Sequence, residues 1–107
     1  MKSESALSLL AALAQETRLD IFRLLVTAGC GGLAAGDIAT ALQVPAATLS
    51  FHLKELKSAG AIRCTRQGRS LVYRPDFAAM GDLVNFLFAH CREGLQVTTT
   101  AQRGPLP

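Results

Sequence analysis

The chain has 107 residues, half of them hydrophobic, and carries a formal net charge of +3. This is the size of one domain, and the hydrophobic share exceeds what a monomer of this size easily buries, so we expect an oligomer. The chain has three widely spaced cysteines and no recognisable signal peptide, which argues against a secreted protein. It also has no apolar run near the roughly 20 residues that a membrane span needs, so we expect a cytoplasmic protein.

The N-terminal part of the chain is predicted to form two helices. The first spans residues 4–14, where apolar side chains recur at helical spacing without Gly or Pro. The second begins at Thr17, which is expected to cap it in a capping box with Asp20, and it ends at Gly29. The glycine-rich run 29–32 then reads as a flexible link.

Two further helices, over residues 35–42 and 46–59, are separated by a tight turn, which is the helix-turn-helix pattern. In the second of them, Leu49, Leu53 and Leu56 form an apolar stripe that must face a core. The other sides carry small, hydroxyl, aromatic and basic side chains, a mixture that suits a DNA groove. The predicted DNA contacts on this helix are Ala46, Ala47, Thr48, Ser50, Phe51, His52, Lys54 and Lys57.

Two of these assignments have alternatives. His52 lies about 60° around the helix from the leucine stripe, so helix packing or a phosphate contact is as reasonable as base reading. Phe51 is expected outside, against a thymine methyl group, although a core position in another register is possible.

After Gly60 the hydrophobic period changes from helical to alternating, which predicts a β-hairpin with strands over 62–65 and 70–73. Arg66 and Arg69 stand near its tip, where guanidinium groups can contact phosphates or enter a minor groove. Residues 45–74 hold six basic side chains and one acidic side chain, whereas the remainder holds five basic and seven acidic ones. This concentration of positive charge indicates a nucleic-acid partner.

Pro75 and Asp76 are expected to open a last helix, with Asp76 as its cap. A broad apolar stripe runs along this helix from Phe77 to Cys91, and together with the first helix it is predicted to form a dimer interface. The domain would then span residues 1–93, and the polar residues 94–107 would form a flexible tail.

Three segments carry a family resemblance: ETRLDIFRLL, GDIATALQVPAATLSFHLKELKSAGAI and RQGRSLVYRP. Over about residues 5–92 the chain resembles the ArsR/SmtB family of winged-helix repressors. The resemblance implies a mainly α fold with a small β-hairpin and a homodimer that forms through the first and last helices. It also implies that the dimer binds an inverted-repeat operator in double-stranded DNA and leaves it when an inducer binds. No set of catalytic groups is apparent, so we do not expect an enzyme.

The inducer sites of this family are only partly matched. The Cys-x-Cys-Asp of the best-known arsenite sensors is replaced by Ala34-Ala35-Gly36-Asp37. Of the zinc site on the last helix, Asp76 is kept, but the other ligand positions hold Ala78, Ala89 and Arg92. Some arsenic-responsive members instead place cysteines at the end of the last helix, where Cys91 stands.

Trivalent arsenic and antimony are thiophilic and take three thiolates, so Cys30, Cys64 and Cys91 are the candidate ligands of an inducer, and no obligatory cofactor is expected. An organoarsenical would need only two of them. Three alternatives remain open at this point: structural cysteines, with Cys64 a small buried hydrophobe; a thiol redox or sulfide-sensing repressor; and a winged-helix module that binds protein rather than DNA.

Overall fold

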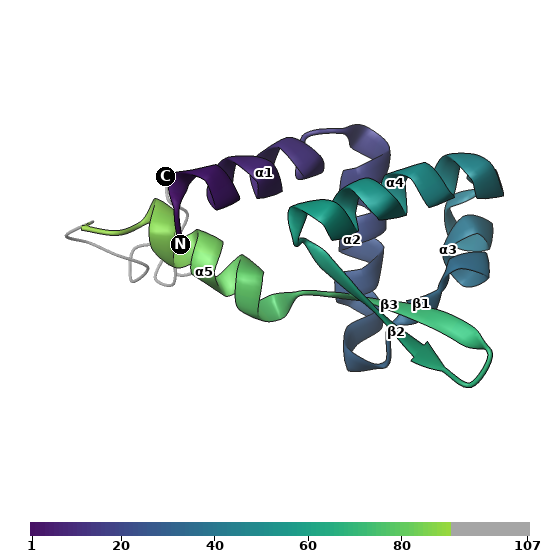
Figure 1. The fold of residues 1–107 in the computed structure, drawn as a ribbon. Coiled ribbons are helices and arrows are strands. Elements are labelled where there is room, and N and C mark those ends of the chain that lie inside the picture. The colour runs from purple at the N-terminus through teal and green to yellow at the C-terminus, as the bar shows by residue number, and fades with distance from the viewer. Residues whose placement is uncertain (91–107) are drawn as a thin grey trace, which may run out of the picture.

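Five helices and a three-stranded sheet make up the computed structural model, which describes residues 1–90 (Figure 1). This confirms the predicted mainly α, winged helix-turn-helix fold. The elements in chain order are α1 (Ser3–Leu13), α2 (Glu16–Ala28), the 3₁₀ turn η1 (Gly29–Gly31), β1 (Leu33–Ala34), α3 (Ala35–Leu42), α4 (Ala46–Ala59), β2 (Ile62–Gln67), β3 (Ser70–Pro75) and α5 (Phe77–Leu87).

The core lies where the helices meet behind the hairpin. Each helix contributes the apolar side chains of one face, and α4 contributes the predicted stripe of Leu49, Leu53 and Leu56, which are 0–3% exposed. Ile21 and Leu25 of α2 are completely buried beside them. In Figure 1, α1 and α5 lie together at one end of the molecule, while α3, α4 and the hairpin lie at the other. The described residues contain no helix that is long and apolar enough to cross a membrane.

Two helix ends test the capping predictions. Asp76 caps α5 as predicted, because its carboxylate accepts a hydrogen bond of 2.9 Å from the backbone N–H of Ala79. The predicted capping box of α2 is wrong. Gln15 stands at the N-cap, and its side-chain oxygen accepts from the N–H of Arg18 at 2.8 Å, so that Thr17 already lies inside the helix.

The C-terminal end also differs from the prediction. Helix α5 ends at Leu87, so Phe88 lies beyond it rather than on a continuous helical stripe. Cys91 and the predicted tail, residues 94–107, lie outside the described residues.

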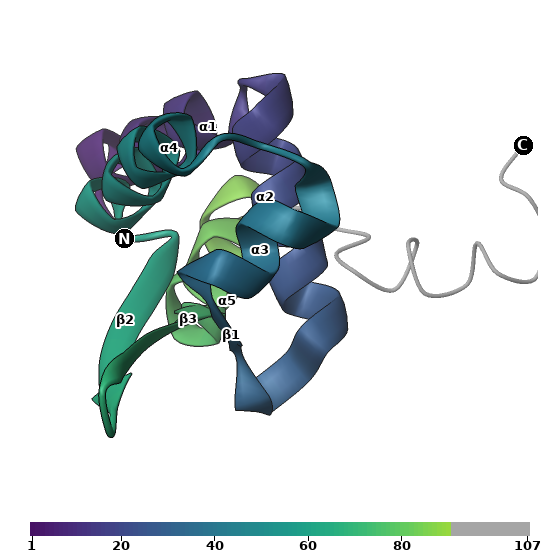
Figure 2. The same cartoon turned by 90° about the vertical axis from the view of Figure 1, so that its right-hand side faces the viewer.

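The sheet has the strand order β1-β3-β2, with antiparallel pairing throughout. Strands β2 and β3 form the predicted hairpin, closed by a two-residue turn at Gly68 and Arg69. Strand β1 was not predicted: the segment after α2 is a 3₁₀ turn followed by two residues that pair with β3. Figure 2 shows β1 beside β3 and beneath α3.

The glycine-rich segment is therefore held in place rather than being a free link. The Arg74 side chain donates a 2.8 Å hydrogen bond from Nε to the carbonyl of Cys30 and a second bond from Nη1 to the Thr65 hydroxyl. Gly32, at the end of the turn, has φ +69° and ψ −176°, a conformation that is essentially restricted to glycine. A Cβ there would lie 2.7 Å from the Tyr73 carbonyl oxygen and 2.7 Å from Cγ1 of Val72.

We expect Gly32→Ala to lower the free energy of unfolding by at least about 2 kcal/mol, because it adds both backbone strain and a steric clash with β3. Urea denaturation followed by circular dichroism measures the change. Gly31→Ala is the matched control, since a Cβ at Gly31 meets no atom within 4 Å. Equal effects of the two substitutions would contradict this account of β1.

Candidate nucleic-acid interface

The outer side of α4 presents the side chains that the sequence analysis assigned to DNA, with one exception. Phe51 is 56% exposed, which confirms its outward position. The remaining exposed members of the predicted set on this helix are Ala46, Ala47, Thr48, Ser50, Lys54 and Lys57. They stand on a helix whose opposite side is locked into the core, so a rigid element carries them.

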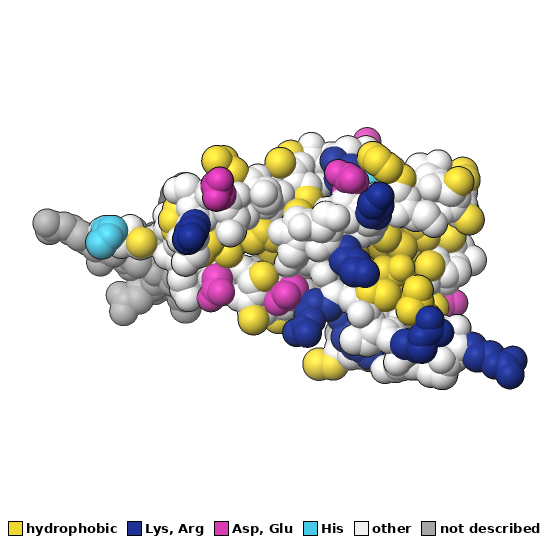
Figure 3. Space-filling view, viewed as in Figure 1, with side chains coloured by type: hydrophobic (Ala, Val, Ile, Leu, Met, Phe, Trp, Pro, Cys, Tyr) yellow, Lys and Arg dark blue, Asp and Glu magenta, His cyan; other side chains and the backbone are white. Residues whose placement is uncertain are grey.

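The hairpin continues this surface. Arg66 and Arg69 are exposed near its tip, and Arg63 is exposed further down the same strand pair. In Figure 3, Lys and Arg side chains gather on one face of the molecule, over α4 and along the hairpin to its tip. A basic surface formed by a helix and an adjacent β-hairpin is suited to the phosphates on either side of a DNA groove.

His52 does not belong to this surface, which corrects its assignment as a DNA contact. It is only 9% exposed, and its Nδ1 lies 3.2 Å from Nη1 of Arg18. Because a guanidinium can only donate, Nδ1 is the acceptor in this contact. The ring also meets Phe51 edge to face, with 5.4 Å between the ring centroids. His52 therefore supports the recognition helix from within the protein.

Arg18 is a positioning residue to which the sequence analysis assigned no role. It stands in the first turn of α2, and its Nε donates a 2.7 Å hydrogen bond to the carbonyl of Ala12 near the end of α1. Its Nη1 reaches His52 on α4, so one half-buried side chain joins three helices. The sequence signal for its importance was its place inside the ETRLDIFRLL segment that carries the family resemblance. Residue spacing alone does not reveal its hydrogen-bond partner His52, which lies 34 positions away.

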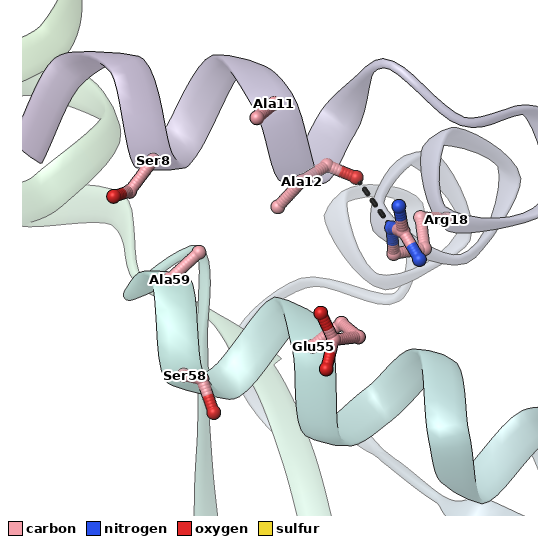
Figure 4. A pocket seen from close by; sticks show the side chains of 7 residues that line it. All are labelled: Ser8, Ala11, Ala12, Arg18, Glu55, Ser58 and Ala59. Atoms are coloured by element: carbon pink, nitrogen blue, oxygen red, sulfur yellow. Dashed lines mark hydrogen bonds between the residues drawn. The ribbon is translucent and has the colours of Figure 1, made fainter.

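A hollow of about 350 Å³ lies beside Arg18, between α1 and α4. Figure 4 shows small side chains along most of it, with Arg18 and Glu55 as its charged members and the Arg18–Ala12 hydrogen bond at one end. The hydrogen bonds of Arg18 thus lie at the edge of this hollow, where they join α1, α2 and α4.

The candidate thiolate ligands lie in different settings. Cys30 is an exposed free cysteine in η1, and Cys64 is a half-buried free cysteine in β2 that pairs across the sheet with Tyr73. Within residues 1–90 no group of three His, Cys, Asp or Glu side chains is arranged to hold a metal ion. Cys91 lies outside this range, so a site built from all three cysteines stays a prediction.

Comparison with known proteins agrees with this geometry. A family model described as a helix-turn-helix domain matches residues 13–65. The homodimeric winged helix-turn-helix DNA-binding domain Mb0332 from Mycobacterium bovis, a possible ArsR-family transcriptional regulator, is 30% identical; the match covers 83% of this chain and 87% of that one, with a TM-score of 0.63. The chain belongs to the ArsR/SmtB family. It is thus a DNA-binding transcriptional regulator with the winged helix-turn-helix fold.

Two further solved structures are similar to this ArsR-family chain. An ArsR-like transcriptional regulator from Rhodococcus sp. RHA1 shares the fold over 97% of this chain and 96% of its own, with a TM-score of 0.71 and 24% identity. A possible transcriptional regulator for arsenical resistance is 25% identical, with a TM-score of 0.63, and the match covers 75% of this chain and 79% of that one. A comparison with curated protein sequences gives no significant match.

We expect Arg18→Lys to lower the free energy of unfolding by about 1–3 kcal/mol, because a lysine ammonium cannot reproduce the two differently directed guanidinium bonds. Urea denaturation is the measurement. Arg23→Lys, an exposed arginine one and a half turns further along α2, is the control and should change stability by less than about 0.5 kcal/mol. Similar values for both variants would show that Arg18 does not fix the helices.

Proposed function

We propose that this protein is a homodimeric repressor that binds an inverted-repeat operator and leaves it when a thiophilic inducer binds cysteine thiolates. The observation that carries the DNA-binding part is the exposed, basic surface shared by α4 and the hairpin. In a dimer the two α4 helices would enter successive major grooves, about 34 Å apart.

The apolar surface of α1 and α5 supports the dimer. Leu7 of α1 is 65% exposed, and Leu87 at the end of α5 is 53% exposed. Further large apolar side chains on the same two elements are exposed as well: Leu10, Phe77, Val84 and Phe86. An apolar surface of this extent, exposed among residues 1–90, favours association, and the solved relative Mb0332 is described as homodimeric.

Trivalent arsenic or antimony is the favoured inducer. The support is chemical: Cys30 and Cys64 are free thiols, and Cys91 is a third thiol in the chain. One solved relative is described as a possible regulator for arsenical resistance. The exposed thiol of Cys30 also suits a second candidate, a repressor that responds to oxidation or sulfide.

The DNA-binding part predicts a change in salt dependence when the arginines of the hairpin are removed. Arg66→Ala with Arg69→Ala should weaken binding to every duplex and reduce the slope of log Kobs against log[salt] by about 0.9 for each phosphate that these arginines neutralise. Fluorescence anisotropy with a duplex selected from a random-sequence pool measures both quantities.

Lys2→Ala with Arg23→Ala is the matched control, because it removes two charges at exposed positions of the N-terminal segment and α2. If the slope falls equally in both double variants, the hairpin does not contact phosphates, and only net charge matters.

The inducer part predicts release of the bound duplex by arsenite, phenylarsine oxide or antimonite in the reduced protein. Cys30→Ser, Cys64→Ser and Cys91→Ser should each be tested, and substitution of a true ligand should abolish release while leaving DNA affinity within about twofold. Release by oxidants that dithiothreitol reverses, without any response to arsenite, would favour the redox-sensing repressor instead.

A further inference from the structure

A notch of about 170 Å³ lies between the recognition helix and the hairpin. Its lining residues come from one side of α4 and from the central strand of the sheet: Ser50, Leu53, Lys54, Lys57 and Tyr73. Ser50, Lys54 and Lys57 are spaced four and three residues apart, so they stand in a row along the helix, and the buried Leu53 lies between them.

The polar side chains of this notch favour an anion. Lys54 and Lys57 supply two ammonium groups, Ser50 and Tyr73 supply two hydroxyl donors, and no carboxylate lines the notch. Its volume is several times the roughly 30 Å³ that one water molecule occupies, so the notch has room for a phosphate group and bridging water.

The position of the notch identifies which anion it meets. When α4 enters a major groove and the hairpin reaches the adjacent minor groove, the sugar-phosphate strand that separates the two grooves must pass between them. The notch occupies this space between helix and strand. A phosphate of that strand would therefore lie against Tyr73 on one side and the two lysines on the other.

We propose that this notch is a binding site for one backbone phosphate in each half-site. Tyr73 is then a phosphate-binding residue that sets the register of the DNA between α4 and the hairpin. The inference rests on the proposed DNA-binding function and adds a specific residue and a specific chemical group to it. It assigns a binding role to a side chain that lies outside the helix-turn-helix.

Tyr73 is well placed to act as a fixed donor. It lies on the central strand β3, between Leu33 of β1 and Cys64 of β2 in the sheet register. Partial burial raises the pKa of its hydroxyl above the ordinary value of 10.0, and a hydrogen bond to the neighbouring Cys64 side chain and the negative charge of its ionised form act in the same direction. On DNA binding the hydroxyl would turn its single proton from the Cys64 sulfur, a weak acceptor, to a charged phosphate oxygen, which is the stronger acceptor.

The first test compares Tyr73→Phe with Lys57→Gln on the same selected duplex. Tyr73→Phe should weaken binding about tenfold and leave the salt slope unchanged, because it removes a donor but no charge. Lys57→Gln should weaken binding and reduce the slope by about 0.9. An unchanged affinity for Tyr73→Phe, in a variant whose unfolding midpoint matches the wild type, would overturn the proposal.

A second test locates the phosphate. Duplexes in which one phosphate at a time is replaced by an uncharged methylphosphonate should reveal, in each half-site, a position at which the affinity of the wild type falls and that of Tyr73→Phe falls no further. If the losses of affinity caused by Tyr73→Phe and by the methylphosphonate are additive at every position, the proposed phosphate site is wrong. Ser50→Ala should show the same non-additivity at the same position, which keeps the test valid if Tyr73→Phe folds poorly.

A third readout needs no variant. Tyr73 is the only tyrosine, and the chain has no tryptophan, so the intrinsic fluorescence of the protein reports on this side chain alone. DNA binding should shield it from acrylamide quenching, and equal quenching in free and bound protein would contradict the proposal. If the wild type shows no salt-dependent DNA binding at all, the proposed function fails together with the proposed phosphate site. If the wild type binds DNA but the Tyr73 experiments give the contrary results, only the phosphate site is wrong and the DNA-binding function stands.

Discussion

Burial of three leucines on one side of α4 determines what the other side of that helix can do. Leu49, Leu53 and Leu56 are almost fully inaccessible, and burying each contributes about 1.5–3 kcal/mol relative to an exposed position. A rotation of α4 by one residue, about 100°, would expose leucine side chains and carry Phe51 toward the core. The energetic penalty of that rotation fixes the outward direction of the hydroxyl, aromatic and basic side chains. The interface with DNA is thus a consequence of the core, and the polar side chains themselves need contribute nothing to folding.

Apolar packing fixes the rotation of α4, whereas hydrogen bonds help to fix its position relative to α1. Apolar packing has no preferred direction, and a hollow of about 350 Å³ lies between the two helices beside Arg18. The guanidinium of Arg18 joins the carbonyl of Ala12 to the imidazole of His52, and these bonds are directional. Since α1 also carries part of the apolar surface that we assign to the dimer, the same side chain connects the dimer surface with the recognition helix.

The sequence predicted those features whose cause lies within a few neighbouring residues. The leucine spacing of α4, the alternation of the hairpin strands and the Asp76 cap are local, and each was confirmed. Strand β1 escaped prediction because two residues show no period, and its pairing with β3 depends on a contact across some 40 positions. The cap of α2 was assigned to Thr17 because hydroxyl residues are the commoner caps, whereas the long side chain of Gln15 serves here. His52 stands at the boundary between the two faces of α4, and its distant partner Arg18 decided the outcome.

The short strand β1 gives the hairpin a gradient of stiffness. It pairs only with Val72 and Tyr73, so the middle of the hairpin is part of a three-stranded sheet, while the part from Arg66 to Leu71 is a two-stranded ribbon. Two-stranded ribbons are only marginally stable alone and twist more strongly than wider sheets. The three-stranded part is therefore the stiffer one, and the two-stranded tip is the more compliant. Minor grooves differ in width with their base sequence, and a tip that yields can follow those differences at little energetic cost, without disturbing the register that the three-stranded part maintains.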